Sequence, residues 1–181
     1  MKKYLTLDVG GSAIKYALIQ EDLKILEKSS VPTPRDTLDN FIETIGKLYD
    51  QYAVDIEGIA ISMPGIIDPE KGYSYTGGAL RYIDKLETVK VLKQRCPVNI
   101  TIGNDAKCAA NAEIGYGHLQ DIQDGAVVIL GTGIGGCLIK NHKVHTGQHF
   151  SAGEFSFVKT NCHDPLGWDF AWSTRNGIDG L

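Results

Sequence analysis

The sequence predicts an α/β fold, and three observations support it. Residues 57–63, EGIAISM, are almost continuously apolar, as in a strand buried on both faces of an α/β sheet. From Thr37 to Tyr52, apolar residues recur every three or four positions, which is typical of an amphipathic helix packed on a sheet. Two glycine-rich turns, within residues 7–18 and 130–137, each lie between apolar runs that read as strands.

The composition limits the function classes. A chain of 181 residues can form one domain or two small ones. Its net charge of −4 offers no basic face for nucleic acid, so we expect no nucleic-acid partner. No apolar run reaches the length of a membrane span or carries a cleavage site, so we expect no membrane association and a cytoplasmic location. The four cysteines lack CxxC spacing and read as reduced thiols.

The first glycine turn, in LDVGGSAIKYAL (residues 7–18), reads as a phosphate-binding hairpin. Glycine without Cβ can take positive φ and lets backbone N–H groups approach an anion. The anion-binding residues would be Gly10, Gly11, Ser12 and Lys15. Asp8 beside them would require a divalent cation between carboxylate and phosphate. The alternative is a simple hairpin turn, where glycine pairs are common.

The second glycine cluster, LGTGIGGC (residues 130–137), lies between AVVI and LIK. Two such hairpins suggest two facing half-sites. A dinucleotide-binding fingerprint would lead from its glycines into a helix, but LIKNHKV reads as strand and turn, which argues against that fold.

Between these hairpins, expected strands alternate with expected helices. A turn at residues 33–36 leads into the helix, and Pro64-Gly65 follows the apolar strand at its carboxyl end. Open α/β sheets place ligand loops at that end, although Pro-Gly also marks simple reversals. The remaining expected elements are a strand at 24–31, a glycine-containing loop at 73–81, a helix at 84–95, a strand at 98–102 and a helix at 109–116.

Asn104 and Asp105 lie between the strand at 98–102 and the last helix. Asn and Asp are preferred helix caps, and capping is one explanation for both. In the other, one residue caps the helix while the second faces a cleft, where a carboxylate can take a proton from a substrate hydroxyl during phosphoryl transfer.

Five motifs, DVGGSAIK, SMPGIID, IGNDAKCAANAE, ILGTGIGG and AGE, occur in this order between Leu5 and about Phe157. In this the chain resembles the ROK (repressor, open reading frame, kinase) family of bacterial sugar kinases. The resemblance implies an actin-like, ribonuclease H-like fold with two domains flanking a nucleotide cleft. It also implies ATP with Mg²⁺ and transfer of the γ-phosphoryl group to a hexose hydroxyl.

The resemblance also implies residue roles. Asp105 matches the catalytic base, and Asn104 and Glu154 match sugar contacts. Gly65 and Gly78 lie on loops expected to contact the substrate. The first phosphate loop comprises Asp8, Gly10, Gly11, Ser12 and Lys15, and the second Thr132, Gly133, Gly135 and Gly136. Asp8 would approach Mg²⁺ through phosphate or water.

The chain departs from the family pattern after Glu154. Ser156 and Phe157 stand where the family usually has Gly and His, and no cysteine cluster follows. Cys162-His163 alone cannot supply four zinc ligands, so we expect no zinc site. The sequence is closer to the zinc-free branch of β-glucoside kinases and enzymes suggested to act on N-acetylmannosamine, and glucose is also a candidate substrate.

We expect a first domain at residues 1–120 and an incomplete second domain at 121–181, because family kinases carry a further helical portion. The 181 residues alone should therefore be a weak kinase. A homodimer is expected from the family only. The alternative is a non-catalytic sugar sensor or regulator, although the phosphate loop at Asp8 leaves no room for a preceding DNA-binding helix-turn-helix. An actin-like structural or chaperone fragment would not need the hydroxyl-binding residues Asn104, Asp105 and Glu154.

Overall fold

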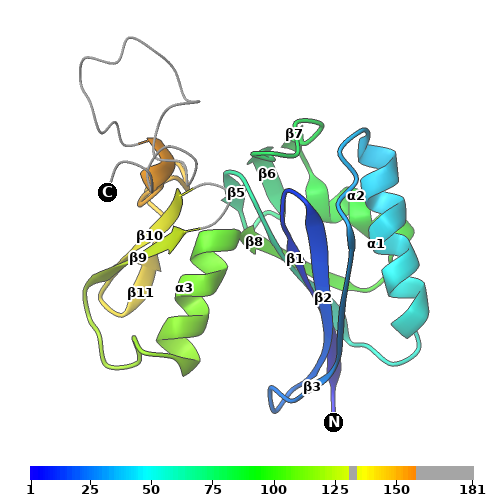
Figure 1. The fold of residues 1–181 in the computed structure, drawn as a ribbon, viewed down its shortest axis with the longest axis horizontal. Coiled ribbons are helices and arrows are strands. Elements are labelled where there is room, and N and C mark those ends of the chain that lie inside the picture. Colours follow the sequence, from blue (N-terminus) through cyan, green and yellow to red (C-terminus); the bar gives the residue numbers. More distant parts are fainter. Residues whose placement is uncertain (131–133, 158–181) are drawn as a thin grey trace. The chain divides into compact units, whose positions relative to one another are not determined.

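The computed structural model describes residues 1–130 and 134–157 and divides the chain into two compact units (Figure 1). Unit 1 comprises Met1–Asp105 and unit 2 Ala106–Leu181. This division precedes the boundary expected at residue 120, because helix α3 (Asp105–Tyr116) belongs largely to unit 2. There a Cβ on Gly135 would lie 3.6 Å from the Cβ of Ala106. Within the described ranges, no helix is long and apolar enough to cross a membrane.

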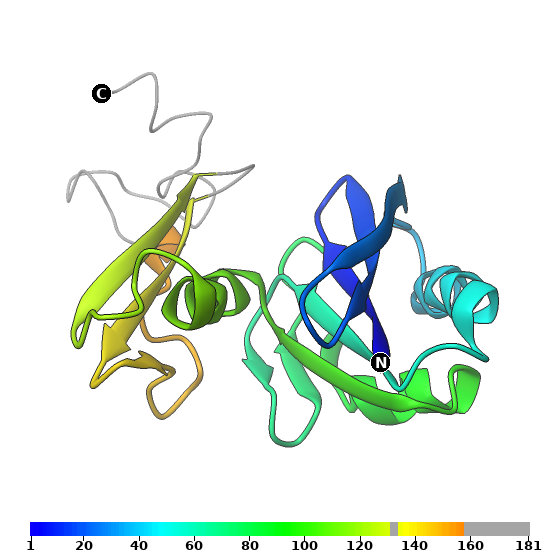
Figure 2. The ribbon, with the colours of Figure 1, turned by 90° about the horizontal axis from the view of Figure 1, so that it is seen from below.

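Unit 1 is built on a five-stranded sheet in the order β3-β2-β1-β4-β8 (Figures 1 and 2). Its strands are β1 (Lys3–Val9), β2 (Ala13–Gln20), β3 (Ile25–Pro32), β4 (Gly58–Met63) and β8 (Asn99–Asn104). The first three pair antiparallel, and β4 and β8 run parallel to β1. The α/β prediction is therefore confirmed, and the first glycine turn connects β1 to β2 as expected.

Helices α1 (Leu38–Tyr52) and α2 (Thr88–Arg95) cover one face of this sheet. Thr37 caps α1 by accepting a hydrogen bond from the backbone N–H of Asn40 at 3.2 Å. The core is formed by side chains that alternate along the strands and by the helices' apolar sides, including Leu5, Leu7, Ile59, Ile61, Ile100, Ile102, Phe41, Ile45 and Leu92.

The expectation that residues 57–63 are buried on both sheet faces is wrong. In β4, Ile59 and Ile61 are buried, whereas Ala60 between them is exposed. The run reads as continuously apolar because alanine is small and nonpolar, although it lies on the face opposite the helices. This opposite face is where Asp8 lies, beside Ser62 of β4.

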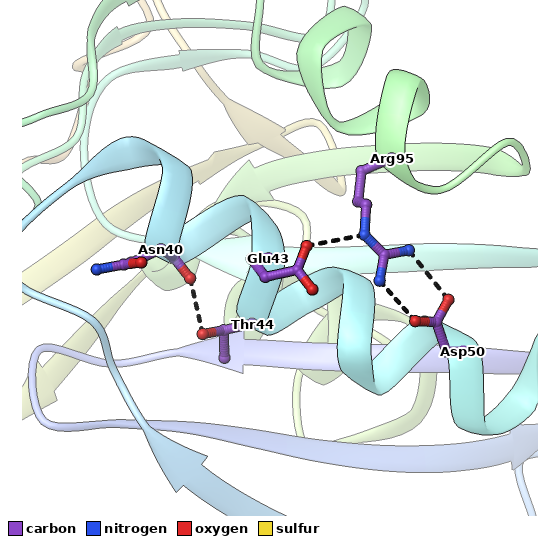
Figure 3. A network of polar contacts seen from close by, with 5 residues as sticks. All are labelled: Asn40, Glu43, Thr44, Asp50 and Arg95. Carbon is purple, nitrogen blue, oxygen red and sulfur yellow. Dashed lines mark hydrogen bonds and ion pairs between the residues drawn. The ribbon is translucent and has the colours of Figure 1, made fainter.

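Arg95, the last residue of α2, joins the two helices (Figure 3). Its Nε donates to Glu43 Oε2 at 3.0 Å, and its two terminal nitrogens bind the carboxylate of Asp50 at 3.0 and 2.5 Å. The stem crosses α1 at Gly46, where an added Cβ would lie 2.7 Å from Arg95 Cγ. Arg95 lowers the pKa values of Glu43 and Asp50, chiefly by these hydrogen bonds.

Unit 1 also contains a second, three-stranded sheet, and two of the predictions for its residues are wrong. It consists of β5 (Ile67–Asp68), β6 (Tyr73–Thr76) and β7 (Asp84–Leu86). The expected loop at 73–81 therefore begins as a strand, and the expected helix at 84–95 begins only at Thr88. Residues 84–86 pair with β6 instead, and the buried Thr88 hydroxyl donates to Ser74 Oγ at 2.7 Å, joining α2 to that strand.

Unit 2 contains an antiparallel sheet of β9 (Gly125–Leu130), β10 (Ile134–Lys140) and β11 (Lys143–His145), together with α3 and a short helix, η1 (Phe155–Phe157). The expected second hairpin is confirmed as the β9–β10 pair, while the central residues of its turn, 131–133, lie outside the described residues. Cys137 and Ile139 are buried, whereas Val128 and Leu130 are 51% and 66% exposed.

Candidate functional site

The carboxyl ends of the parallel strands β1, β4 and β8 meet at one edge of the unit 1 sheet. Asp8 is opposite Ser62, Ser62 is opposite Gly103, and Met63 is opposite Asn104. The first glycine turn begins directly beyond β1, and Gly65 follows shortly after β4. At this edge, where α/β sheets bind ligands, lie Asp8 and Asn104, and the first glycine turn and the Gly65 loop follow directly beyond it.

The first glycine turn is closed by a hydrogen bond from the Gly10 N–H to the Ala13 carbonyl at 3.0 Å. Neither Gly10 nor Gly11 has a positive φ, so the left-handed conformation considered for these glycines does not occur. Gly10 is tightly placed instead, since a Cβ there would lie 3.1 Å from the Ala13 carbonyl oxygen. A Cβ on Gly11 would lie 3.8 Å from the Cβ of Ala79, so the loop following β6 lies beside this turn.

Asp8 points away from the helices, and its side chain is 53% exposed. Oδ1 accepts a hydrogen bond from Ser62 Oγ at 3.3 Å, and Oδ2 lies 3.6 Å from Lys15 Nζ. An ion pair this exposed is worth at most about 1 kcal/mol, so a cation can replace Lys15 beside Asp8, and a phosphate can bind Lys15 in place of Asp8, at little cost. The donor set thus fits a hydrated divalent cation beside phosphate.

No three Asp, Glu, His or Cys side chains gather into a metal-binding group within the described ranges. A magnesium ion beside Asp8 would accordingly take its other ligands from phosphate and water, as Mg²⁺ commonly does. Cys162 and His163, the pair weighed for zinc, lie outside the described residues.

Asn104 is the central polar residue of this edge. It ends β8 with only 4% of its surface exposed, and its Nδ2 donates to the Gly65 carbonyl and to Asp105 Oδ1, both at 3.0 Å. Asp105 is exposed and begins α3. One buried amide thus joins the loop after β4 to the candidate base.

Gly65 and Gly78 pack against each other with φ values of +111° and +58°. A Cβ on Gly65 would lie 2.8 Å from the Thr76 carbonyl carbon, and a Cβ on Gly78 would lie 3.1 Å from Pro64 Cβ. Both positions therefore need glycine for conformation and for space. The structure joins the Pro-Gly turn to the Gly78 loop and to Asn104, and a ligand-binding role for this turn stays a prediction.

Sequence reasoning missed a segment that holds the first glycine turn. Thr33 Oγ1 donates to the Gly10 carbonyl at 2.7 Å, and Arg35 Nε donates to the Gly11 carbonyl at 2.8 Å. Tyr82 Oη donates to the Pro34 carbonyl at 2.7 Å, and burial raises the pKa of Tyr82 to about 12, so it remains a donor. The signal was the sequence TPRD itself, read only as a turn before α1.

In unit 2, the structure describes Gly135, Gly136 and Glu154, whereas Thr132 and Gly133 lie outside the described residues. A Cβ on Gly136 would lie 2.7 Å from the Gly153 carbonyl oxygen, so this glycine lets the Glu154 segment cross β10. Glu154 Oε1 accepts hydrogen bonds from Ser156 Oγ at 2.7 Å and its N–H at 3.4 Å. Ser156, which stands where the family usually has Gly, therefore hydrogen-bonds the predicted sugar-binding residue Glu154.

The predicted residues therefore form two sets, one in each unit. Burial raises the pKa of the unit 2 thiol Cys137. It also raises the pKa of Cys96 in unit 1 to about 11, so neither cysteine is a candidate nucleophile.

Comparison with known proteins gives a consistent result. Residues 4–168 match the model of the ROK family. A β-glucoside kinase of Klebsiella pneumoniae is 32% identical over 159 residues, which cover 88% of this chain and 53% of that kinase. This chain spans about half the length of the curated relatives it matches.

Two solved structures extend the comparison. A Listeria monocytogenes protein proposed to be an N-acetylmannosamine kinase is 29% identical with a TM-score of 0.85, covering 94% of this chain and 58% of that one. A glucokinase of Streptomyces griseus, in complex with glucose and AMPPNP, is 25% identical with a TM-score of 0.78, covering 88% of this chain and 51% of that one. The actin-like fold implied by the motifs is confirmed by these neighbours.

Proposed function

Since the chain belongs to the ROK family, we propose that its protein uses ATP to phosphorylate a hydroxyl of a hexose or hexose derivative, with Asp105 as the general base. The observation that carries this proposal is the hydrogen bonding of Asn104. Its buried amide binds both the Gly65 carbonyl and Asp105 Oδ1, at the sheet edge that also holds the first glycine turn.

The amide fixes the orientation of the base. A carboxylate accepts hydrogen bonds on both oxygens, and Asn104 occupies Oδ1. Asp105 is exposed, so its carboxylate can receive the proton of a substrate hydroxyl as that oxygen attacks the γ-phosphorus. Phosphoryl transfer depends mainly on positioning and charge neutralisation, and a base held by a buried amide supplies the positioning.

For the nucleotide, we propose that the turn at Gly10–Ser12 and Lys15 bind phosphate oxygens, together with Thr132, Gly133, Gly135 and Gly136 of unit 2. Asp8 would hold Mg²⁺ through water or phosphate, and the ion would neutralise charge on the phosphates. Lys15 would then exchange its exposed ion pair with Asp8 for contacts with phosphate.

For the sugar, we propose hydroxyl contacts with Asn104, Asp105 and Glu154 and loop contacts at Gly65 and Gly78. The names of the similar proteins point to β-glucosides, N-acetylmannosamine and glucose as candidate substrates. All three present ring hydroxyls to carboxylate and amide groups, so these contacts are common to the whole class.

Sugar-dependent ADP release by the full-length protein tests the proposal. The assay would compare glucose, N-acetylmannosamine, N-acetylglucosamine and a β-glucoside at a fixed ATP concentration, with and without excess EDTA. We expect ADP release that needs one of these sugars and is abolished by EDTA. Saturable sugar binding in calorimetry, with no sugar giving ADP release from ATP, would contradict the kinase proposal and favour a non-catalytic sugar sensor.

A further inference from the structure

We propose that Thr33 and Arg35 are positioning residues that set the donor direction of the first glycine turn, and so control its affinity for the phosphates of a nucleotide. This inference rests on the proposed function. The two residues belong to the segment between β3 and α1, defined here as the strap (Thr33–Arg35), which no predicted role includes.

The strap occupies every carbonyl group of the turn. Thr33 Oγ1 donates to the Gly10 carbonyl at 2.7 Å, and Arg35 Nε donates to the Gly11 carbonyl at 2.8 Å. The backbone N–H of Thr33 donates to the Ser12 carbonyl at 3.1 Å. Three successive carbonyl groups therefore point toward one short segment.

The geometry of the peptide unit determines where the backbone N–H groups of the turn point. The peptide unit is planar and trans, so each carbonyl points opposite to the N–H of the next residue. When the strap holds the carbonyls of Gly10 and Gly11, the N–H groups of Gly11 and Ser12 are directed away from it. Neither N–H donates a hydrogen bond to any described residue. Two adjacent, outward N–H groups are the arrangement that binds phosphate oxygens.

Arg35 also acts on the Ser12 hydroxyl. One of its terminal nitrogens donates to Ser12 Oγ at 3.4 Å, so that oxygen serves as an acceptor. A hydroxyl that accepts from arginine still has its own hydrogen to donate. The Ser12 hydroxyl is thereby biased toward donating to an anion, and the guanidinium adds positive charge beside the turn.

The strap is itself anchored. Thr33 is only 7% exposed, and Tyr82 Oη donates to the Pro34 carbonyl at 2.7 Å. A strap anchored at Thr33 and Pro34 holds the turn in its binding conformation before the nucleotide arrives, which lowers the entropic cost of binding.

The test measures ADP and adenosine affinities by calorimetry on the full-length protein and on the variants Thr33→Val and Arg35→Lys. Valine keeps the shape of threonine without its hydroxyl, and lysine keeps the charge without the arginine fork. We expect ADP to bind about three- to tenfold more weakly to each variant, as loss of about one hydrogen bond implies. Adenosine and sugar affinities should stay unchanged, since neither ligand uses the phosphate donors. Lys28→Met, an exposed change on β3, should leave all three affinities unchanged.

A loss of ADP affinity matched by equal losses for adenosine and sugar would overturn the inference, because the strap would then act only through general stability. Unchanged ADP affinity in Arg35→Lys would also overturn it, and that exposed residue can be replaced without disturbing the core. A wild-type protein that binds no ADP would overturn the proposed function and this inference with it.

Discussion

The side-chain amide of Asn104 donates a hydrogen bond to the carbonyl oxygen of Gly65, 3.0 Å away. Asn104 ends β8, and Gly65 lies on the loop just after the neighbouring strand β4, so the bond ties that loop to the end of β8. The same nitrogen also reaches the carboxylate of Asp105. The position of the candidate base therefore depends on the conformation of a loop that lies almost forty residues earlier in the chain.

Replacing Asn104 by alanine tests this dependence. The change leaves the Gly65 carbonyl and Asp105 Oδ1 without their buried donor, at a cost of about 1–3 kcal/mol. In the full-length protein we expect kcat/KM for the sugar to fall at least tenfold while the Kd for ADP stays within twofold. Steady-state kinetics and calorimetry measure the two quantities. A matched loss of ADP affinity would indicate a general structural defect instead.

Gly65→Ala should destabilise the protein by about 1–3 kcal/mol, because φ of +111° and the nearby Thr76 carbonyl both disfavour a Cβ. Gly115 in α3 provides a matched control, since a Cβ there meets nothing within 4 Å. Gly115→Ala should instead be neutral or stabilise by up to about 1 kcal/mol through helix propensity. Urea unfolding of both variants measures the free energies, and equal effects would show that the packing at Gly65 is unimportant.

The Gly46–Arg95 contact predicts a dependence between two substitutions. Alanine at position 46 should improve helix propensity by about 1 kcal/mol, but its Cβ would displace the Arg95 stem and break the ion pairs in Figure 3. We expect Gly46→Ala to be neutral or destabilising in the wild type and stabilising in an Arg95→Ala background. A double-mutant cycle measured by urea unfolding gives the coupling, and additive effects would contradict the predicted contact.

The Arg95 ion pairs also predict an acid dependence of stability. Arg95 holds the pKa values of Glu43 and Asp50 below their ordinary values of 4.5 and 3.8. Carboxylates with lowered folded-state pKa values stabilise the fold above the unfolded pKa, and this contribution is lost as pH falls through the folded pKa. The wild type should therefore lose more stability than Arg95→Met between about pH 6 and pH 3. If the urea midpoints of the wild type and Arg95→Met changed in parallel across that range, the ion pairs would not contribute to stability. Both carboxylates are exposed, so the effect is small.

Much of unit 1 could be predicted because its signals are local. Apolar periodicity placed α1, and capping by Thr37 explains where that helix begins. The β5–β6–β7 sheet was missed because its strands are only two to four residues long, too short to show an alternating pattern in the sequence. Residues 84–86 carry no alternation that distinguishes a short strand from the first turn of a helix.

The residues of the candidate site also divide into those that local sequence signals predicted and those that they did not. The motifs identified Asp8, the glycine turn, Asn104 and Asp105, since glycine and paired polar residues after strands are visible in sequence. Thr33 and Arg35 were missed because their partners are backbone carbonyls more than twenty residues away. The sequence TPRD indicated a turn before α1, but a backbone acceptor has no sequence signature, so the contacts of Thr33 and Arg35 with the glycine turn became visible only in the fold.

The central claim is that Asp105 takes the proton of the sugar hydroxyl. Asp105→Asn in the full-length protein tests it most directly, with sugar affinity measured by calorimetry and turnover by sugar-dependent ADP release. The account predicts that sugar binding persists within about threefold while kcat falls by at least a hundredfold, as expected for loss of a general base. Wild-type turnover by Asp105→Asn would contradict the account and remove Asp105 from the mechanism.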